Sequence, residues 1–323
     1  LVAGVLQLLF QLPFLAQIHR LPNPKVDWRD EGVRRVLRLM VPAIFGVSVS
    51  QINLLLDTVI ASFLPTGSIS WLYYSDRLSE LPLGVFGIAI ATVILPSLSR
   101  QHAARTTEVF SRTLDWALRM VLLVAIPAAV ALMILAEPIL TTLFYYGDVM
   151  TPRDIGMATL SLQAYAIGLI AFMLIKVLAP GYFARQDMKT PVRIGIIALV
   201  TNMVLNLAFA LPLHHYLGIG HVGLALATSL AAMLNAGLLF RGLYGLGIYR
   251  PAPGWPRFLL TLLGANLVMA TVLWGFTAYL DQWLFWDGWQ RVGWMLLICL
   301  SGMLVYTLFL LAGGMRPSDL RHR

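Results

Sequence analysis

Nine apolar segments, separated by connections that are alternately rich and poor in Lys and Arg, constrain this chain more than any other feature of its sequence. The segments cover residues 2–18, 41–64, 81–98, 120–135, 156–175, 194–213, 222–240, 258–280 and 292–312. Most of them approach the roughly 20 residues that a helix needs to cross about 30 Å of hydrocarbon. With 59% hydrophobic and only 12% charged residues, a soluble fold would expose too much apolar surface. The sequence therefore predicts an all-α polytopic membrane protein.

The basic residues predict the orientation of these segments in the membrane. Every second connection, together with the C-terminal tail, holds 20 of the 23 Lys and Arg residues. They are Arg20, Lys25, Arg29, Arg34, Arg35, Arg38, Arg100, Arg105, Arg112, Arg119, Lys176, Arg185, Lys189, Arg193, Arg241, Arg250, Arg257, Arg316, Arg321 and Arg323. By the positive-inside rule these connections are cytoplasmic, so the C-terminus is cytoplasmic and the N-terminus is not. The net charge of +8 then faces anionic lipid headgroups, and nucleic acid is not an expected partner.

The beginning of the chain is expected to follow an earlier part of a longer protein. It lacks Met and enters an apolar segment directly, without a signal peptide before it. Residues 1–18 are interpreted as the end of a preceding transmembrane helix. Residues 19–40 combine mixed charges with apolar residues at helical spacing, which is typical of an amphipathic helix on the inner leaflet. This linker helix is predicted to bridge two halves of the full protein.

Polar residues inside the apolar segments indicate an ion-coupling site. In segment 41–64 they recur at spacings that place them on one helix face, and further amides and a hydroxyl occur in two later segments. They are Gly46, Ser50, Asn53 and Asp57, then Asn202 and Asn206, then Thr228. Asp57 is expected about 10 Å below the outer interface, where a charge is costly unless it faces protein or water. One interpretation is a site for a cation or a proton; the other is interhelical hydrogen bonding that holds the bundle together.

A group of charges precedes segment 81–98. Asp76, Arg77 and Glu80 fall on one helix face if this stretch is helical, and aromatic residues surround them. One interpretation is an ion pair that anchors the helix end at the outer interface. The other is that Arg77 faces a water-filled cavity and binds an anion, because a planar guanidinium matches phosphate oxygens. Ser70 is a candidate hydroxyl partner or a helix cap.

No motif for catalysis or cofactor binding is found. The sequence lacks a nucleophile paired with a base, a phosphate-cradling glycine loop and a metal-ligand cluster, so it is not expected to be an enzyme, and no cofactor or metal is expected. Its single cysteine, Cys299, lies within the last segment. His214, His215 and His221 are interpreted as surface residues of an outward connection.

The segment around Arg77 also carries a resemblance to a known family. Residues 71–96, WLYYSDRLSELPLGVFGIAIATVILP, resemble the signature of the MurJ (MviN) lipid II flippases, and the polar stripe ending at Asp57 agrees with it. The resemblance implies two six-helix lobes and a final helix pair, the fold of the multidrug and oligosaccharidyl-lipid exporters. On that template residues 41–240 form the second lobe, 241–257 a cytoplasmic loop, 258–312 the final pair and 313–323 a cytoplasmic tail.

The implied function is transfer of lipid II, the undecaprenyl-linked peptidoglycan precursor, across the bacterial cytoplasmic (inner) membrane by alternating access. Arg77, Glu80, Asp76 and Ser70 are the expected headgroup-binding residues, and the final pair would hold the polyprenyl tail. Some members of the family resemble a sodium-coupled design, with a second acid where this chain has Asn206. Sodium, a proton on Asp57 and the membrane potential, which supplies about 2.3 kcal/mol per charge per 100 mV, are therefore alternative driving forces.

Three other functions are considered. A cation-coupled multidrug exporter of the same superfamily would need a cavity dominated by acids and aromatics. A non-transporting scaffold for cell-wall synthesis enzymes would tolerate changes to polar cavity residues. A lipid-processing enzyme is disfavoured because no catalytic group of residues is present.

Overall fold

The structure is a computed structural model that describes residues 2–17, 30–104, 106–147, 149–279 and 282–315. The regular secondary structure of these residues is helical. The chain divides into two compact units, Leu1–Pro42 and Ala43–Arg323.

The first unit holds helix α1 (Val2–Gln17) and the beginning of helix α2 (Glu31–Ser62). The first half of the predicted linker, residues 19–29, lies outside the described residues. From Glu31 onward the chain is helical, and α2 continues past residue 41, where the sequence predicted the start of a separate span. The hydropathy pattern shows where α2 becomes apolar, at residue 41. The helix itself begins ten residues earlier, at Glu31.

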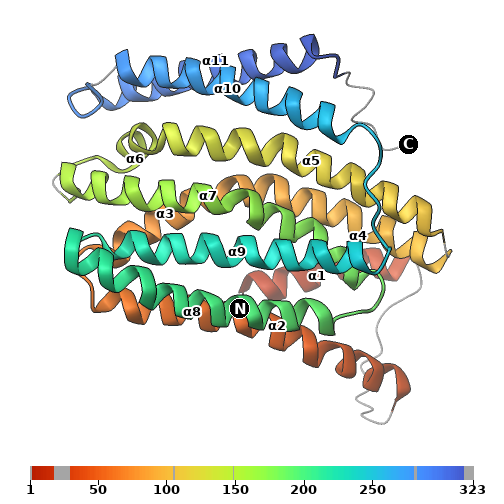
Figure 1. Cartoon of the computed structure of the whole chain (residues 1–323). Coiled ribbons are helices and arrows are strands. Elements are labelled where there is room, and N and C mark those ends of the chain that lie inside the picture. The colour runs from red at the N-terminus through yellow and green to blue at the C-terminus, as the bar shows by residue number, and fades with distance from the viewer. Residues whose placement is uncertain (1, 18–29, 105, 148, 280–281, 316–323) are drawn as a thin grey trace. The chain divides into compact units, whose positions relative to one another are not determined.

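The second unit is a bundle of long helices that run back and forth (Figure 1). After α2 come α3 (Ser68–Pro82), a π-helical turn η1 (Leu83–Gly87), α4 (Ile88–Ala103), α5 (Thr107–Ile134), the short α6 (Ala136–Phe144), α7 (Pro152–Phe183), α8 (Lys189–Leu217), α9 (Gly220–Gly245), α10 (Trp255–Tyr279) and α11 (Gly288–Ala312).

Seven helical stretches within the described residues are long and apolar enough to cross a membrane. They are Ser68–Ala103, Thr107–Ile134, Pro152–Phe183, Lys189–Leu217, Gly220–Gly245, Trp255–Ala278 and Gly288–Ala312. They contain five of the seven predicted spans from 81–98 to 292–312 and overlap most of the other two, 120–135 and 258–280, which confirms a multi-pass membrane protein. The predicted spans at 2–18 and 41–64 coincide with shorter apolar stretches, Gly4–Gln17 and Gln51–Ser62.

The connections of the second unit gather at two ends of the bundle (Figure 1). We call the end formed by connections 104–106, 184–188 and 246–254 the basic end. Several basic residues that the sequence placed in connections lie inside helices instead: Arg112, Arg119, Lys176, Arg193 and Arg241. The helices extend beyond the hydrocarbon, since the 32 residues of α7 span about 48 Å, and long basic side chains reach from helix ends to the interface.

Small residues bring α7, α8 and α9 close together. A Cβ atom added to Gly168 of α7 would lie 2.8 Å from the Cα of Ser229 on α9. One added to Gly223 of α9 would lie 2.7 Å from the backbone nitrogen of Ala210 on α8. The Ser229 hydroxyl also donates to the Ala164 carbonyl of α7 at 2.7 Å. Close approach at small residues and a buried interhelical hydrogen bond are typical of packing in membranes, where hydrophobic exclusion from water is absent.

Two apolar cores stabilise the rest of the second unit. The larger core joins α5, α7 and α9 and includes Leu114, Leu169 and Leu239. The smaller core joins α10 and α11 to each other, with residues of α5 packed against it, and includes Met269 and Ile298. The final helix pair therefore packs on the six-helix lobe through α5.

Candidate functional site

Arg77 lies within a membrane-spanning helix and not in a segment that precedes one. The predicted start of this span at residue 81 was wrong, because the apolar helical stretch runs from Ser68 to Ala103. Arg77 is about 14 Å along the axis from the first residue of α3. Its Nη1 donates to Glu80 Oε2 at 2.7 Å, and its guanidinium lies over the Tyr73 ring, 5.2 Å from the centroid. The two charged side chains stay 54% and 48% exposed, so the pair faces an open surface of the second unit.

The π-helical turn η1 keeps α3 and α4 continuous after Pro82. Proline has no N–H to donate and crowds the preceding turn of an α-helix. Here the Leu83 N–H bonds to the Glu80 carbonyl and the Ile88 N–H bonds to the Leu83 carbonyl. The wider turn accommodates the proline, and π-helical turns of this kind recur at functional sites.

Asp76 and Ser70 do not join the Arg77–Glu80 pair in this structure. The Asp76 carboxylate is half-buried and forms no hydrogen bond or ion pair within the described residues. Ser70 is exposed, two helical turns before Arg77. It does not cap α3 either, because the N-cap is Gly67, whose φ of 103° is left-handed. The expected roles of both residues in headgroup binding stay predictions.

The predicted ion-coupling residues converge on Asp57. Asn206 Nδ2 of α8 donates to Asp57 Oδ1 at 2.6 Å. Thr228 Oγ1 of α9 and Asn53 Nδ2 of α2 lie 3.4 and 3.3 Å from Asp57 Oδ2. Asn202 completes the group, since it donates to Thr228 at 3.2 Å and accepts from Asn206 at 3.0 Å. These five residues, which we call the Asp57 cluster, link three helices, and both amides of α8 are buried.

The amide oxygens of the Asp57 cluster are candidate ligands for a cation. The Asn53 and Asn206 Oδ1 atoms are buried and accept no hydrogen bond. Rotation of either amide would bring its oxygen to the Asp57 carboxylate, an arrangement that is stable only with a proton or a cation between them. Carboxylate, amide and hydroxyl oxygens are ligands for hard cations. The described residues contain no group of three or more His, Cys, Asp and Glu side chains suited to a metal ion.

A second polar cluster, around Asp115 of α5, was missed by the sequence interpretation. Asp115 Oδ1 accepts from Tyr249 OH at 2.8 Å, from Trp255 Nε1 at 2.7 Å and from the Ala252 N–H at 3.1 Å. Its Oδ2 pairs with Arg119 Nε at 2.9 Å. Burial and the bond to Asp115 raise the pKa of the Tyr249 hydroxyl, which stays a donor. The opposite charges of Asp115 and Arg119, four residues apart in α5, were the available signal.

Two further buried residues differ from expectation. His221 was interpreted as a surface residue, yet it is fully buried, lies 3.2 Å from the Met157 carbonyl and packs against the Trp71 ring at 4.8 Å. Arg291 of α11 is also buried, and its guanidinium donates to the Tyr145 carbonyl at 2.7 Å. Both residues join the ends of helices far apart in sequence, so they hold the fold together.

Long apolar helices that enclose a half-buried carboxylate, Asp57, and carry a half-exposed arginine within a membrane-spanning stretch are typical of one lobe of a membrane transporter. A multidrug resistance MATE family transporter of the MOP superfamily, in an outward-facing conformation, has the same fold, with a TM-score of 0.53, 16% identity and coverage of 86% of this chain and 64% of that one. A MOP superfamily transporter from Pyrococcus furiosus matches with a TM-score of 0.52 and 18% identity over 86% and 64% of the two chains.

The chain belongs to the MurJ family. The family described as "Lipid II flippase MurJ" matches residues 1–288. "Probable lipid II flippase MurJ" of Vibrio cholerae is 52% identical over 320 residues, 99% of this chain and 60% of that protein. The protein of the same description from Haemophilus influenzae is 49% identical over 325 residues, 99% of this chain and 62% of that protein.

A solved structure agrees with this assignment. "Lipid II flippase MurJ, inward closed conformation" is 29% identical to this chain, with a TM-score of 0.68 over 92% of this chain and 58% of that one. The chain thus spans about three fifths of the length of the curated relatives it matches.

Proposed function

We propose that this chain forms the second six-helix lobe and the final helix pair of a lipid II flippase in the bacterial cytoplasmic membrane, with its C-terminus in the cytoplasm. The full protein would move the lipid-linked precursor from the inner to the outer leaflet by alternating access, without covalent chemistry. The observation that carries the proposal is Arg77, a half-exposed cation within a membrane-spanning helix. Such a charge is costly in lipid and is typical of a water-filled substrate pathway.

Arg77 has the free donors that a diphosphate requires. A guanidinium carries five N–H donors, and Glu80 takes one of them. The Tyr73 ring supports the guanidinium plane, which leaves a fork of donors for two phosphate oxygens. When no substrate is bound, Glu80 accepts a hydrogen bond from Arg77. When the diphosphate is bound, the Glu80 carboxylate competes with it for the guanidinium, so the substrate can still be released. Asp76 adds negative charge beside the site, and Ser70 offers a hydroxyl two turns away.

The Asp57 cluster is proposed as the coupling site. Its only formal charge is the Asp57 carboxylate, because Asn202 and Asn206 are neutral, so one monovalent cation or one proton would neutralise it. The two buried oxygens without hydrogen bonds support this proposal, since a bound cation would satisfy them. Binding would draw α2, α8 and α9 together and so bias the conformation of the lobe. Drive by the membrane potential remains an alternative.

The outer faces of the final helix pair are proposed to contact lipid tails, including the polyprenyl chain of the substrate. Leu260, Leu267 and Trp274 of α10 are 70%, 69% and 67% exposed, and Met303 of α11 is 68% exposed. These side chains offer an apolar surface continuous with the hydrocarbon.

The proposal is tested in cells whose only copy of the full-length protein carries Arg77→Ala or Arg77→Lys. The measurement is exposure of the lipid-linked precursor to a membrane-impermeant probe. Arg77→Ala is expected to reduce exposure about tenfold or more, because hydrogen bonds to a charged group contribute about 1.5–3 kcal/mol. Exposure with Arg77→Lys is expected to lie between that of the wild type and that of Arg77→Ala, since lysine keeps the charge but lacks the two parallel N–H donors.

Arg153→Ala serves as the matched control. Arg153 is exposed at the start of α7 and forms no ion pair within the described residues. If precursor exposure is normal with Arg77→Ala, the Arg77–Glu80 pair only anchors the end of its helix. That result would favour a scaffold for cell-wall synthesis enzymes. Drug efflux that survives Arg77→Ala would favour a cation-coupled multidrug exporter.

A further inference from the structure

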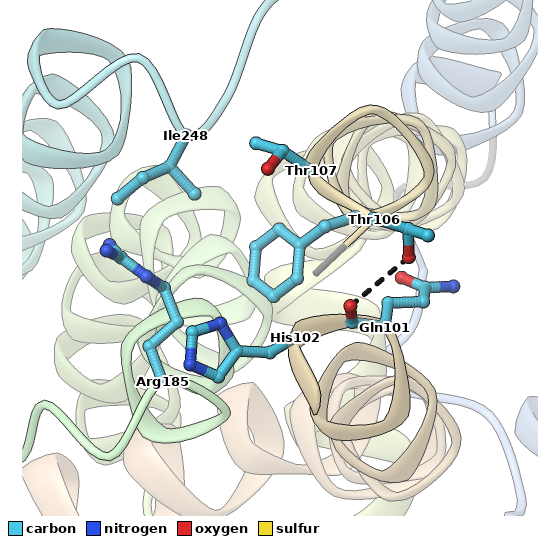
Figure 2. A pocket seen from close by; sticks show the side chains of 7 residues that line it. Gln101, His102, Thr106, Thr107, Arg185 and Ile248 are labelled. Carbon is cyan, nitrogen blue, oxygen red and sulfur yellow. Dashed lines mark hydrogen bonds between the residues drawn. The ribbon is translucent and has the colours of Figure 1, made fainter. Parts of the chain in front are cut away.

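A small pocket, lined by neither Arg77 nor the Asp57 cluster, opens at the basic end of the second unit (Figure 2). It lies between the end of α4, the start of α5, the turn after α7 and the connection between α9 and α10. Its lining residues are Gln101, His102, Thr106, Thr107, Phe110, Arg185 and Ile248. Its volume of about 200 Å³ corresponds to about six or seven water molecules. The pocket is therefore too small for a disaccharide or a drug, which need several hundred Å³.

One wall of the pocket is cationic. Figure 2 shows the Arg185 and His102 side chains next to each other, with Ile248 above Arg185 in this view and Thr106 and Thr107 across from them. The turn that carries Arg185 is held by its own hydrogen bonds: the Arg185 and Asp187 N–H groups both bond to the Tyr182 carbonyl, at 2.9 and 3.1 Å. Gln186, between them, has a left-handed φ of 61°. These features fix the backbone conformation of the turn from which the Arg185 side chain extends.

The charge of Arg185 is not neutralised by a neighbouring acid. Asp187, two residues later, turns its carboxylate to the start of α8, where it accepts from the Thr190 N–H at 3.0 Å and from the Thr190 hydroxyl at 2.7 Å. Neither of the two ion pairs in the described part of the chain includes Arg185. Its guanidinium is half-buried and keeps its donors available to a ligand in the pocket.

The start of α5 adds hydrogen-bond donors to the opposite wall. Thr106 is the N-cap of this 28-residue helix, but its hydroxyl donates to the Gln101 carbonyl at 3.2 Å and caps no N–H group. Thr106 therefore leaves the first N–H groups of α5 uncapped, and these groups carry the positive end of the helix dipole, with Glu108 in the same turn. Phe110 and Ile248, 3% and 7% exposed, form an apolar base that lowers the local dielectric constant and strengthens attraction to an anion.

We propose that this pocket binds a phosphate group, supplied either by a lipid headgroup at the membrane surface or by free phosphate. Arg185 would supply charge and N–H donors, His102 a ring N–H donor and Thr107 its hydroxyl. The volume admits a phosphate and excludes the sugars of a lipid-linked precursor, so the site is distinct from the one proposed around Arg77. A bound phosphate would bridge α4–α5, the α7–α8 turn and the connection that leads to the final helix pair, and would hold these three segments together at the basic end.

The test uses the purified, delipidated full-length protein in non-ionic detergent, with thermal unfolding as the readout. One arm adds sodium phosphate, compared with sodium chloride at equal ionic strength. The other adds phosphatidylglycerol, compared with diacylglycerol, which has the same tails and no phosphate. Stabilisation by phosphatidylglycerol alone would identify a lipid headgroup as the ligand, and stabilisation by inorganic phosphate would identify the free ion; either result supports the site.

The variants attribute the effect to the pocket. Arg185→Gln is expected to weaken the apparent affinity about tenfold or more in whichever arm stabilises the wild type, and Arg185→Lys to weaken it less. Arg250→Gln, an exposed arginine at the same end that does not line the pocket, should leave the affinity unchanged. The proposal is overturned if neither phosphate nor phosphatidylglycerol stabilises the wild type, or if Arg185→Gln and Arg185→Lys both respond as the wild type does.

Discussion

The carboxylate of Asp115 and the indole N–H of Trp255 form a 2.7 Å hydrogen bond that joins the first third of α5 to the first residue of α10. The Arg119 guanidinium lies over the Trp255 ring, 5.1 Å from its centroid, and Nη2 donates to the Pro253 carbonyl at 3.1 Å. The connection between the lobe and the final helix pair is therefore held at a fixed place on α5. Movement of the pair relative to the lobe would require these bonds to break.

Trp255→Phe is expected to lower the free energy of unfolding by about 1.5–3 kcal/mol, the usual contribution of a hydrogen bond to a charged group. The ring remains for Arg119 to stack on, so the substitution removes mainly the N–H donor. Denaturant unfolding of the purified full-length protein measures the change. Trp274→Phe is the control, because this tryptophan of α10 is 67% exposed. Equal effects of the two substitutions would contradict the assigned role of the Asp115–Trp255 bond.

Gly223→Ala is expected to destabilise the contact between α8 and α9 by about 1–3 kcal/mol. The added Cβ would lie 2.7 Å from the Ala210 backbone nitrogen, and two helix backbones have to separate to accept it. Gly237→Ala, on the same helix, meets nothing within 4 Å and should be neutral or slightly stabilising, since alanine is the better helix former. An equal loss of thermal stability in both variants would show that the close approach of α8 and α9 at Gly223 is not the cause.

Asp57→Asn is expected to abolish any dependence of the protein on a coupling cation, because it removes the only formal charge of the Asp57 cluster while keeping its shape. Asn206→Asp, which adds a second acid 2.6 Å from Asp57, should strengthen cation binding, since two close carboxylates repel unless a cation lies between them. The measurement is the thermal unfolding midpoint in sodium chloride against choline chloride. Thr201→Ala, a change at a half-buried residue of α8 outside the Asp57 cluster, is the control. Midpoints that do not depend on the cation in the wild type and in Asn206→Asp would leave the cluster as interhelical packing.

Glu80→Gln is expected to change stability by less than about 1 kcal/mol, because exposed ion pairs contribute little. Its effect should be on function. Without the competing carboxylate, Arg77 would bind the precursor diphosphate more tightly and release it more slowly, so purified protein would retain more precursor while cells expose less of it. The proposal requires that the purified variant retains more precursor and that cells expose less of it. If the variant retains less precursor and cells also expose less, Glu80 positions Arg77 for binding and does not compete with the ligand.

The residues of the Asp57 cluster could be predicted from their spacing in the sequence, but their contacts could not. Asn202 and Asn206 are four residues apart in an apolar segment, as are Asn53 and Asp57, so each pair lies on one helix face. Because polar groups avoid lipid, both faces were expected to point inward, and the structure brings them within hydrogen-bonding distance. Which atom bonds to which could not be predicted, since that depends on how α2, α8 and α9 approach each other.

The start of the helix that contains Arg77 was predicted poorly for a physical reason. The charges of Asp76, Arg77 and Glu80 lower the local hydropathy, so the apolar segment seemed to begin at residue 81. The backbone hydrogen bonds continue regardless, and the π-helical turn after Pro82 joins α3 to α4. A hydropathy pattern reports the solvent that side chains would prefer, whereas the extent of a helix is set by backbone bonding and by its neighbours.

By itself, the sequence determined that this chain is a multi-pass helical membrane protein and which polar residues share a helix face, because the thickness of a bilayer and the pitch of a helix apply to each segment separately. Only the tertiary structure decided that Asp115 meets Trp255, that His221 is buried against Trp71 and that Asp187 bonds to Thr190, while Arg185 forms no ion pair within the described residues. Each of these depends on contacts between segments far apart in the chain, or on the geometry of a single turn. Local periodicity does not specify such contacts.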